Sequence, residues 1–298
     1  NYTDWEDKGN SESVNTYGGF YIARYEAGVP TNAAFYVNSN GGTYSTNKNP
    51  STEQIITADE TSLTTEQLAK KLIPVSKKNA QCWNEITQKN SEKVSSAMYY
   101  NNNYVESRLV DSFAWDTIVE WMAKDITKYP NIATNSINYG NYNNNRKIDL
   151  SNILYAAHRY GWKTQNGGGE YKTLATKYTK GNFNSGAESV DSMSGPLKYE
   201  FAKETYKDGY EYDIRKELAT GVSNVTNTKN IYDMAGNMWE WTTETGKHGG
   251  TTTTYAVLRG GSFSNSGSRY PVSYRDGYVS AYDDYDIDIG FRVVLYIK

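Results

Sequence analysis

Few side chains in this sequence could carry out catalysis or bind a transition metal. The chain of 298 residues has one cysteine, Cys82, and two histidines, His158 and His248. One cysteine cannot form an intrachain disulfide or a cysteine-rich zinc site, and two histidines are poor material for a catalytic dyad. Cys82 lies beside Trp83 in NAQCWNEI, which favours a buried apolar role over a nucleophilic one. Glu240 could act as an acid, but no second positioned acid or base accompanies it.

Four aspartates near the C-terminus superficially resemble the ligands of a calcium loop. They are Asp283, Asp284, Asp286 and Asp288. Carboxylate oxygens suit a hard cation, but this run lacks the central glycine and the distal bidentate glutamate of an EF-hand. We therefore interpret it as a solvated or ligand-facing loop.

The aspartates end an unusual segment, residues 259–292, with the sequence RGGSFSNSGSRYPVSYRDGYVSAYDDYDIDIGFR. Its tyrosines at helical spacing are Tyr270, Tyr274, Tyr278 and Tyr282. Pro271 and Gly277 interrupt that spacing, so a compact irregular loop is predicted instead of a helix. Tyrosine provides contact area at low entropic cost, and Asn, Ser and Gly provide adaptable hydrogen bonds, as in antibody loops. With 28 tyrosines in the chain, a core and an adhesive polar surface can coexist.

The overall composition excludes two classes of partner. The net charge is −3 and no Lys/Arg block occurs, which argues against binding to a nucleic-acid backbone. No run of about 18 apolar residues is present, so membrane insertion is not expected. The N-terminal residues NYTDWEDKGN are polar and lack the apolar core of a secretion signal.

The elements that would position this segment can be predicted from periodicity. GGFYIARYEAG (18–28) alternates like a strand, and AVLRGGSF and IGFRVVLYI indicate two more near the C-terminus. Apolar spacing predicts helices over 87–98 and over 111–125, the second capped by Asp111 or Ser112. We expect a polar arm over 1–17 and one domain over 18–298. In it, the strand around Phe20–Tyr25 should lie close to the C-terminal strand Phe291–Ile297, and Trp239, Trp241 and Phe291 should be largely buried. Residues 129–230 are predicted to be a loop-rich insertion, and residues 259–292 are interpreted as a candidate variable binding segment.

Three motifs carry a resemblance to a known family. They are NIYDMAGNMWEWTTE (230–244), VLRGGSF (257–263) and GFRVVLYI (290–297). In this order they resemble the formylglycine-generating enzyme (sulfatase-modifying factor) family. The resemblance implies an α+β, loop-rich variant of the C-type lectin-like fold, with two helices and small twisted antiparallel sheets.

The resemblance has different consequences for the family's two metals. Its enzymes oxidise a substrate cysteine with copper held by two cysteines after the Gly-Gly-Ser element, positions that fall on Asn265 and Tyr270 here. Neither side chain suits Cu(I), which needs thiolate or thioether ligands, so no catalytic residue and no required cofactor are expected. The family also implies a possible structural calcium. Its ligands would be Asp233, the main-chain carbonyls of Gly236 and Met238, and Glu240.

A second group with this fold fits the 259–292 segment better. The chain is similar to the variable proteins of diversity-generating retroelements, whose last segment is mutagenised while its flanks stay fixed. That resemblance implies a non-catalytic protein that binds a protein or glycan ligand on a cell surface, at a phage tail tip or bacterial cell surface. The alternatives are a fixed phage tail protein or cell-surface adhesin of the same fold, and, less favoured, a formylglycine-generating oxidase. The candidate ligand-binding residues are Phe263, Ser264, Asn265, Ser266, Arg269, Tyr270, Tyr274, Asp276, Tyr278, Tyr282, Asp283, Asp284, Tyr285, Asp286 and Asp288.

Overall fold

Strand β17 (Val293–Ile297) brings the two ends of the chain together. In the computed structural model it lies between β2 (Tyr21–Ile22) and β5 (Val105–Leu109) in an antiparallel sheet. Val294 is paired with Ile22 on one side and with Arg108 on the other. The predicted contact between the first strand and the C-terminal strand is therefore confirmed. The structure describes residues 2–7, 9–28, 36–39, 42–45, 74–78, 80, 82–84, 86–145, 148, 155–165, 168–175, 178–179, 203–205, 211–248, 254–277 and 288–298.

The central sheet has the strand order β1-β13-β14-β15, with β16 added in parallel beside β13. Its strands are β1 (Tyr2–Glu6), β13 (Trp239–His248), β14 (Thr254–Arg259), β15 (Arg275–Gly277) and β16 (Ile289–Phe291). On β13, Glu240 is paired with Arg259 of β14 and also with Gly290 of β16. Both ends of the 259–292 segment are thus neighbours of the same residue.

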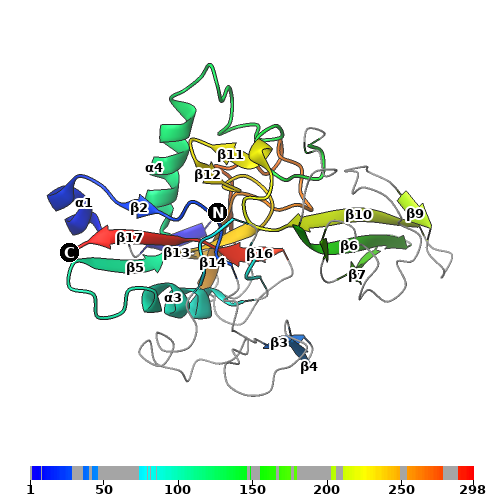
Figure 1. The fold of residues 1–298 in the computed structure, drawn as a ribbon, viewed down its shortest axis with the longest axis horizontal. Coiled ribbons are helices and arrows are strands. Elements are labelled where there is room, and N and C mark those ends of the chain that lie inside the picture. The colour runs from blue at the N-terminus through cyan, green and yellow to red at the C-terminus, as the bar shows by residue number, and fades with distance from the viewer. Residues whose placement is uncertain are drawn as a thin grey trace.

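Three helices occur in the described residues: α1 (Ser11–Tyr17), α3 (Gln88–Ala97) and α4 (Ser112–Ala123). The last two confirm the predicted helices. Each begins at a capping side chain: Thr87 accepts from the Asn90 amide at 3.2 Å, and Asp111 from the Ala114 amide at 2.8 Å. Figure 1 shows α4 and α3 on opposite sides of the sheet that contains β5 and β17.

The N-terminal residues were predicted as a polar arm, without any element. Instead, β1 pairs with β13, and α1 contacts the C-terminal strand. The Ser13 hydroxyl donates to the Ile297 carbonyl at 2.6 Å, and the Tyr17 hydroxyl to the Lys298 carbonyl at 2.6 Å. These contacts span more than 280 positions in sequence, so local periodicity does not reveal them.

The predicted loop-rich insertion contains a sheet of its own, with order β7-β6-β10-β9 and β8 beside β6. These strands extend away from the rest of the fold (Figure 1). Strand-forming Tyr160, Trp162 and Thr164 alternate in β6, and Tyr212 and Ile214 in β10, although Gly- and Asn-rich runs lie nearby in the sequence. The bounds are β6 (Tyr155–Gln165), β7 (Gly168–Ala175), β8 (Tyr178–Thr179), β9 (Lys203–Thr205) and β10 (Glu211–Leu218). Smaller elements are β3 (Tyr36–Ser39), β4 (Gly42–Ser45), a 3-10 turn (Asn224–Thr226), β11 (Asn227–Thr228) and β12 (Ile231–Tyr232).

The core consists of two large apolar clusters, between which β17 divides its side chains: Val293 belongs to one, and Val294 and Tyr296 to the other. One gathers Trp83, Trp241 and Phe291, and the other surrounds Trp115 of α4. Trp239, Trp241 and Phe291 are 7%, 0% and 0% exposed, which confirms that the Gly-Asn-x-Trp-Glu-Trp and Gly-Phe-Arg motifs supply core residues. The observed architecture is α+β.

Candidate binding face

The Arg-Gly-Gly-Ser motif begins the binding segment (residues 259–292) with a backbone conformation that favours glycine. Gly260 and Gly261 have φ values of 89° and 73°. A Cβ at Gly260 would lie 2.8 Å from the Met234 carbonyl oxygen, and one at Gly261 would lie 2.7 Å from the Tyr270 carbonyl oxygen. Two glycines therefore let the chain leave β14 and turn tightly against its own segment.

Beyond the glycines, the segment lies on an asparagine-rich loop, residues 131–145, which we call the backing loop. The Ser136 amide donates to the Gly267 carbonyl at 2.9 Å, and the Asn143 amide to the Asn265 carbonyl at 2.9 Å. The Ser136 hydroxyl accepts from the Val272 amide at 2.8 Å, and the Trp115 indole donates to the Val272 carbonyl at 2.9 Å. This backing fixes the backbone of residues 264–272 without using a regular element.

Two of the candidate tyrosines pack on a buried tryptophan. The Tyr270 and Tyr274 ring centroids lie 5.7 and 6.0 Å from that of Trp239, and 4.9 Å from each other. Trp239 is 7% exposed, whereas both tyrosines are half-buried. Exposed Arg269 places its guanidinium 5.3 Å from the Tyr270 ring centroid. The Trp239 ring thus holds both tyrosine rings in place, while part of each tyrosine remains accessible to a ligand.

Phe263 is the candidate residue whose position differs from expectation. It is 1% exposed and packs with Cys82 and Met238, so its side chain does not reach the surface. The residue follows directly on the Gly-Gly-Ser turn, where its amide donates to the Asn237 carbonyl at 2.9 Å. An apolar side chain in this position anchors the segment to the core instead of facing a ligand.

The serines, Asn265 and Asp288 form a hydrogen-bonded base for the segment. The hydroxyls of Ser262 and Ser264 donate to Asp288 Oδ2 at 2.6 and 2.9 Å. Asn265 Oδ1 accepts from the Ser262 amide at 2.9 Å, and Ser266 Oγ accepts from Asn144 Nδ2 at 2.9 Å. Ser262 is buried, whereas the side chains of Ser264, Asn265, Ser266 and Asp288 remain partly accessible. The acidic residue at the end of the segment therefore holds the start of the segment in place.

The remaining candidates divide into two groups. Asp276 of β15 is half-buried, and burial raises the pKa of its carboxyl group. The others lie outside the described residues: Tyr278, Tyr282, Asp283, Asp284, Tyr285 and Asp286. The expected single patch can thus be located only over residues 264–277, where Arg269, Tyr270 and Tyr274 lie together.

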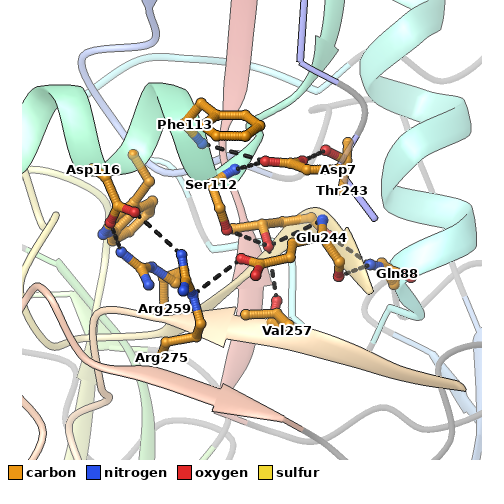
Figure 2. A network of polar contacts seen from close by, with 12 residues as sticks. Asp7, Gln88, Ser112, Phe113, Asp116, Thr243, Glu244, Val257, Arg259 and Arg275 are labelled. Carbon is orange, nitrogen blue, oxygen red and sulfur yellow. Dashed lines mark hydrogen bonds and ion pairs between the residues drawn. The ribbon is translucent and has the colours of Figure 1, made fainter. Parts of the chain in front are cut away.

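An ion-pair network ties the start of the segment and β15 to α4 and β13 (Figure 2). Buried Arg259 pairs with Asp116 of α4, and half-exposed Arg275 bonds to Asp116 Oδ2 at 3.1 Å. Arg275 also lies 3.1 Å from Glu244 Oε2 on β13. Two arginines alternating with two carboxylates keep the buried Arg259 charge compensated, which a buried cation requires.

Asp7, also shown in Figure 2, joins the N-terminal residues to the same helix. Its carboxylate accepts from the Ser112 and Phe113 amides at 2.9 and 3.3 Å, and from the Thr243 hydroxyl at 2.6 Å. Burial raises the pKa of Asp7 to about 6, in spite of these hydrogen bonds. Sequence reasoning missed Asp7 because its partners lie more than 100 positions away.

Of the four possible calcium ligands, Glu240 is paired with a buried arginine. Glu240 Oε1 and Oε2 accept from Arg292 Nη2 and Nε at 2.7 and 3.0 Å, and both side chains are fully buried. Asp233 Oδ2 accepts from the Gly221 amide at 2.6 Å. Because Arg292 already supplies a cation to both Glu240 oxygens, Glu240 does not fit the role of a calcium ligand in this arrangement. No group of three His, Cys, Asp or Glu side chains in the described ranges is arranged to hold a metal.

A further carboxyl group, missed in the sequence, lies beside this pair. Glu26 Oε2 accepts from Asn237 Nδ2 at 2.7 Å and lies 3.4 Å from the Cys82 sulfur. Burial, with Asp233 and Glu240 nearby, raises the pKa of Glu26 well above its ordinary value. Burial likewise raises the pKa of the Cys82 thiol, so it is a protonated core residue and not a thiolate ligand.

Comparisons with known proteins bear on the C-terminal half. Residues 155–297 match the family described as Sulfatase-modifying factor enzyme 1-like domain, in agreement with the resemblance of the sequence motifs. Among solved structures, the crystal structure of CarF is similar, with 25% sequence identity over 28% of this chain and 30% of that chain, at a TM-score of 0.25. A likeness at that TM-score carries no argument. No curated protein matches the chain.

Proposed function

We propose that this protein is a non-catalytic binding protein that recognises a protein or glycan ligand on a cell surface through the binding segment. Trp239, which holds Tyr270 and Tyr274 in place, is the observation that carries the proposal. Ordering a flexible loop costs free energy on binding, and a face whose rings are already packed avoids much of that cost. The proposed binding needs no cofactor.

The distribution of buried and accessible residues within the segment supports the proposal that its sequence is diversified. Residues with fixed roles lie at its ends: buried Arg259, Gly260 and Phe263 at one, and buried Gly290 and Phe291 at the other. The residues between 264 and 277 are mainly polar or tyrosine, and the backing loop bonds to their backbone at Asn265, Gly267 and Val272. Accessible side chains on a backbone held in this way, such as Arg269, can be exchanged with little effect on the core. We therefore propose a variable protein of a diversity-generating retroelement, with a C-type lectin-like fold, located at a phage tail tip or bacterial cell surface.

The binding face can be tested with Arg269→Ala, Tyr270→Ala and Tyr274→Ala combined in one variant. The wild-type chain is screened on a printed array of bacterial glycans and on intact bacterial cells, and the strongest binder is then measured with the variant. We expect binding to be lost and the melting temperature to fall by less than about 5 °C, because the rings are only half-buried. The matched control is Tyr21→Ala with Tyr104→Ala, two tyrosines that are 63% and 78% exposed elsewhere. Equal loss of binding in the control, or none in the triple variant, would refute the assignment of this face.

A separate expectation is that the protein has no copper-dependent oxidase activity. Asn265 and Tyr270 offer no thiolate, and Cys82 is buried and protonated, so soft copper ligation at the family's position is not expected. Purified protein incubated with Cu(I) and passed over a desalting column should retain no stoichiometric copper. It should also consume no oxygen with a cysteine-containing peptide. Copper-dependent turnover of that peptide would favour the oxidase alternative.

A fixed phage tail protein or adhesin of the same fold is the second candidate. Its binding face would use the same residues, so mutagenesis does not separate the two proposals. The surroundings of the gene separate them, because a near-copy of its 3′ end beside a reverse transcriptase gene indicates diversification. The absence of both from the gene's surroundings would favour the fixed adhesin.

A further inference from the structure

A partly open cavity of about 660 Å³ lies away from the binding segment. Its walls are formed by α3, the turn that follows it, β5 and the C-terminal Lys298, and none of its lining residues belongs to 259–292. Figure 1 shows α3 running alongside β5, near the C-terminal end of the chain. The volume is within the range of small-molecule sites.

The lining side chains come mainly from one face of helix α3, from the turn that follows it and from strand β5. Glu92 and Ser96 are one turn apart on α3, and Tyr99 and Tyr100 continue that face in the following turn. Across from them, Glu106 and Arg108 of β5 form an ion pair. The two tyrosines are 43% and 40% exposed, so their rings remain largely available to a ligand.

The turn that carries the tyrosines is held by the neighbouring strands. The Tyr99 amide donates to Ser107 Oγ at 3.2 Å, and this hydroxyl donates to the Ser95 carbonyl at 2.7 Å. Further along, Asn102 Oδ1 accepts from the Tyr104 amide at 2.8 Å, and the Lys298 amine donates to the Asn102 carbonyl at 2.8 Å. The aromatic wall is therefore preorganised, which lowers the entropic cost of binding.

The side-chain charges of the lining are balanced in number. Glu92 and Glu106 are balanced by Arg108 and Lys298, and the Glu106–Arg108 pair is internally neutral. Such a lining attracts neither anions nor cations strongly, but it offers carboxylate acceptors, charged donors and an amide, Asn101. Polar groups of this kind beside two amphipathic rings match a ligand with many hydroxyls and an apolar C–H face.

We infer that this cavity binds a neutral oligosaccharide, with sugar rings stacked on Tyr99 and Tyr100 and hydroxyls bonded to Glu92, Asn101 and the Glu106–Arg108 pair. The site is independent of the proposed binding segment. A phosphorylated sugar would gain nothing from the balanced side-chain charges, and a short peptide has no sugar ring to stack on the tyrosines. These two ligand classes serve as the comparison probes.

The test uses saturation-transfer NMR on the full chain with maltotriose, chitotriose and lactose, and with glucose 6-phosphate and trialanine as comparison probes. We expect transfer to at least one neutral oligosaccharide, and weaker transfer to both comparison probes. Tyr99→Ala and Tyr100→Ala should each weaken binding by about fivefold or more, as expected for the loss of one ring contact. Tyr104→Ala, at a neighbouring exposed ring that does not line the cavity, should leave binding unchanged.

If a tyrosine variant fails to fold, Ser96→Gln tests the site instead. The longer glutamine side chain would occupy the cavity, and the helix position is partly exposed, so the fold should be kept. Loss of transfer in that variant supports the site. Retained transfer, no transfer to any neutral oligosaccharide in the wild type, or preference for glucose 6-phosphate or trialanine overturns it. Transfer that survives Tyr99→Ala but is lost in Tyr270→Ala would overturn it as well, by placing the sugar on the binding segment.

Discussion

Replacing Arg292 with methionine is expected to lower the free energy of unfolding by about 3–5 kcal/mol, the usual cost of removing one partner from a buried ion pair. Arg292 is fully buried and donates to Glu240, to the Ala23 carbonyl at 3.0 Å and to the Tyr232 carbonyl at 2.9 Å. Burial lowers the pKa of Arg292, but the Glu240 carboxylate outweighs this effect and raises it above its ordinary value. Without the guanidinium, the carboxyl groups of Glu26, Asp233 and Glu240 would share a buried site with no cation of their own.

The measurement is urea unfolding of wild type, Arg292→Met and the double variant Arg292→Met with Glu240→Leu. The double variant removes the stranded carboxylate, so it should recover part of the lost stability, though not the bonds to the two carbonyls. A control at the surface is Lys124→Met, which breaks an exposed pair with Glu120 and should cost less than about 1 kcal/mol. If Arg292→Met costs no more than this control, the buried pair does not stabilise the fold.

Replacing Trp239 with alanine should cost about 3–5 kcal/mol, as removal of a large core aromatic usually does. It should also weaken ligand binding, because Tyr270 and Tyr274 lose the ring that holds them in place. Denaturant unfolding gives the first effect, and binding to the strongest partner from the cell and glycan screen gives the second. Binding is measured at a denaturant concentration and temperature well below the variant's unfolding midpoint.

Trp241→Ala is the matched control for Trp239→Ala. Trp241 is fully buried and its indole donates to the Ile86 carbonyl at 2.8 Å, but Tyr270 and Tyr274 pack on Trp239 instead. It should therefore cost a similar amount of stability and leave the affinity of the folded protein nearly unchanged. If Trp239→Ala keeps its unfolding midpoint but loses the ligand, Trp239 belongs to the site itself and is not its structural support.

The sequence predicts the parts of this fold that depend on local signals. Helices α3 and α4 begin at capping residues followed by apolar side chains at helical spacing, and β17 is a short apolar run after a glycine. Strands β6 and β10 were missed because polar, Gly- and Asn-rich stretches hide their alternation. The pairing of β1 with β13 depends on contacts over more than 200 positions, which no local pattern encodes.

The candidate site was predicted in outline but not in its supports. The Tyr, Ser and Asn composition of the segment and its glycine-bounded ends could be read directly. Trp239 was correctly expected in the core, but its stacking with the tyrosines needed three-dimensional information. Phe263 was misjudged because position in a polar segment was given more weight than its apolar side chain. The backing loop had a signal, the run NYGNYNNN, that was interpreted as part of an insertion.

Glu240 is the strand neighbour of both Arg259 and Gly290, so the binding segment starts and ends on strands that flank a single residue. Strands beside a common neighbour lie roughly 10 Å apart, whatever the chain between them does. Loop-closure entropy rises only by about 0.6 kcal/mol for each doubling of loop length. The two flanking strands would therefore tolerate insertions and deletions in residues 278–287, as well as substitutions. For the variable protein proposed above, variation in length would then be a second route to new specificities.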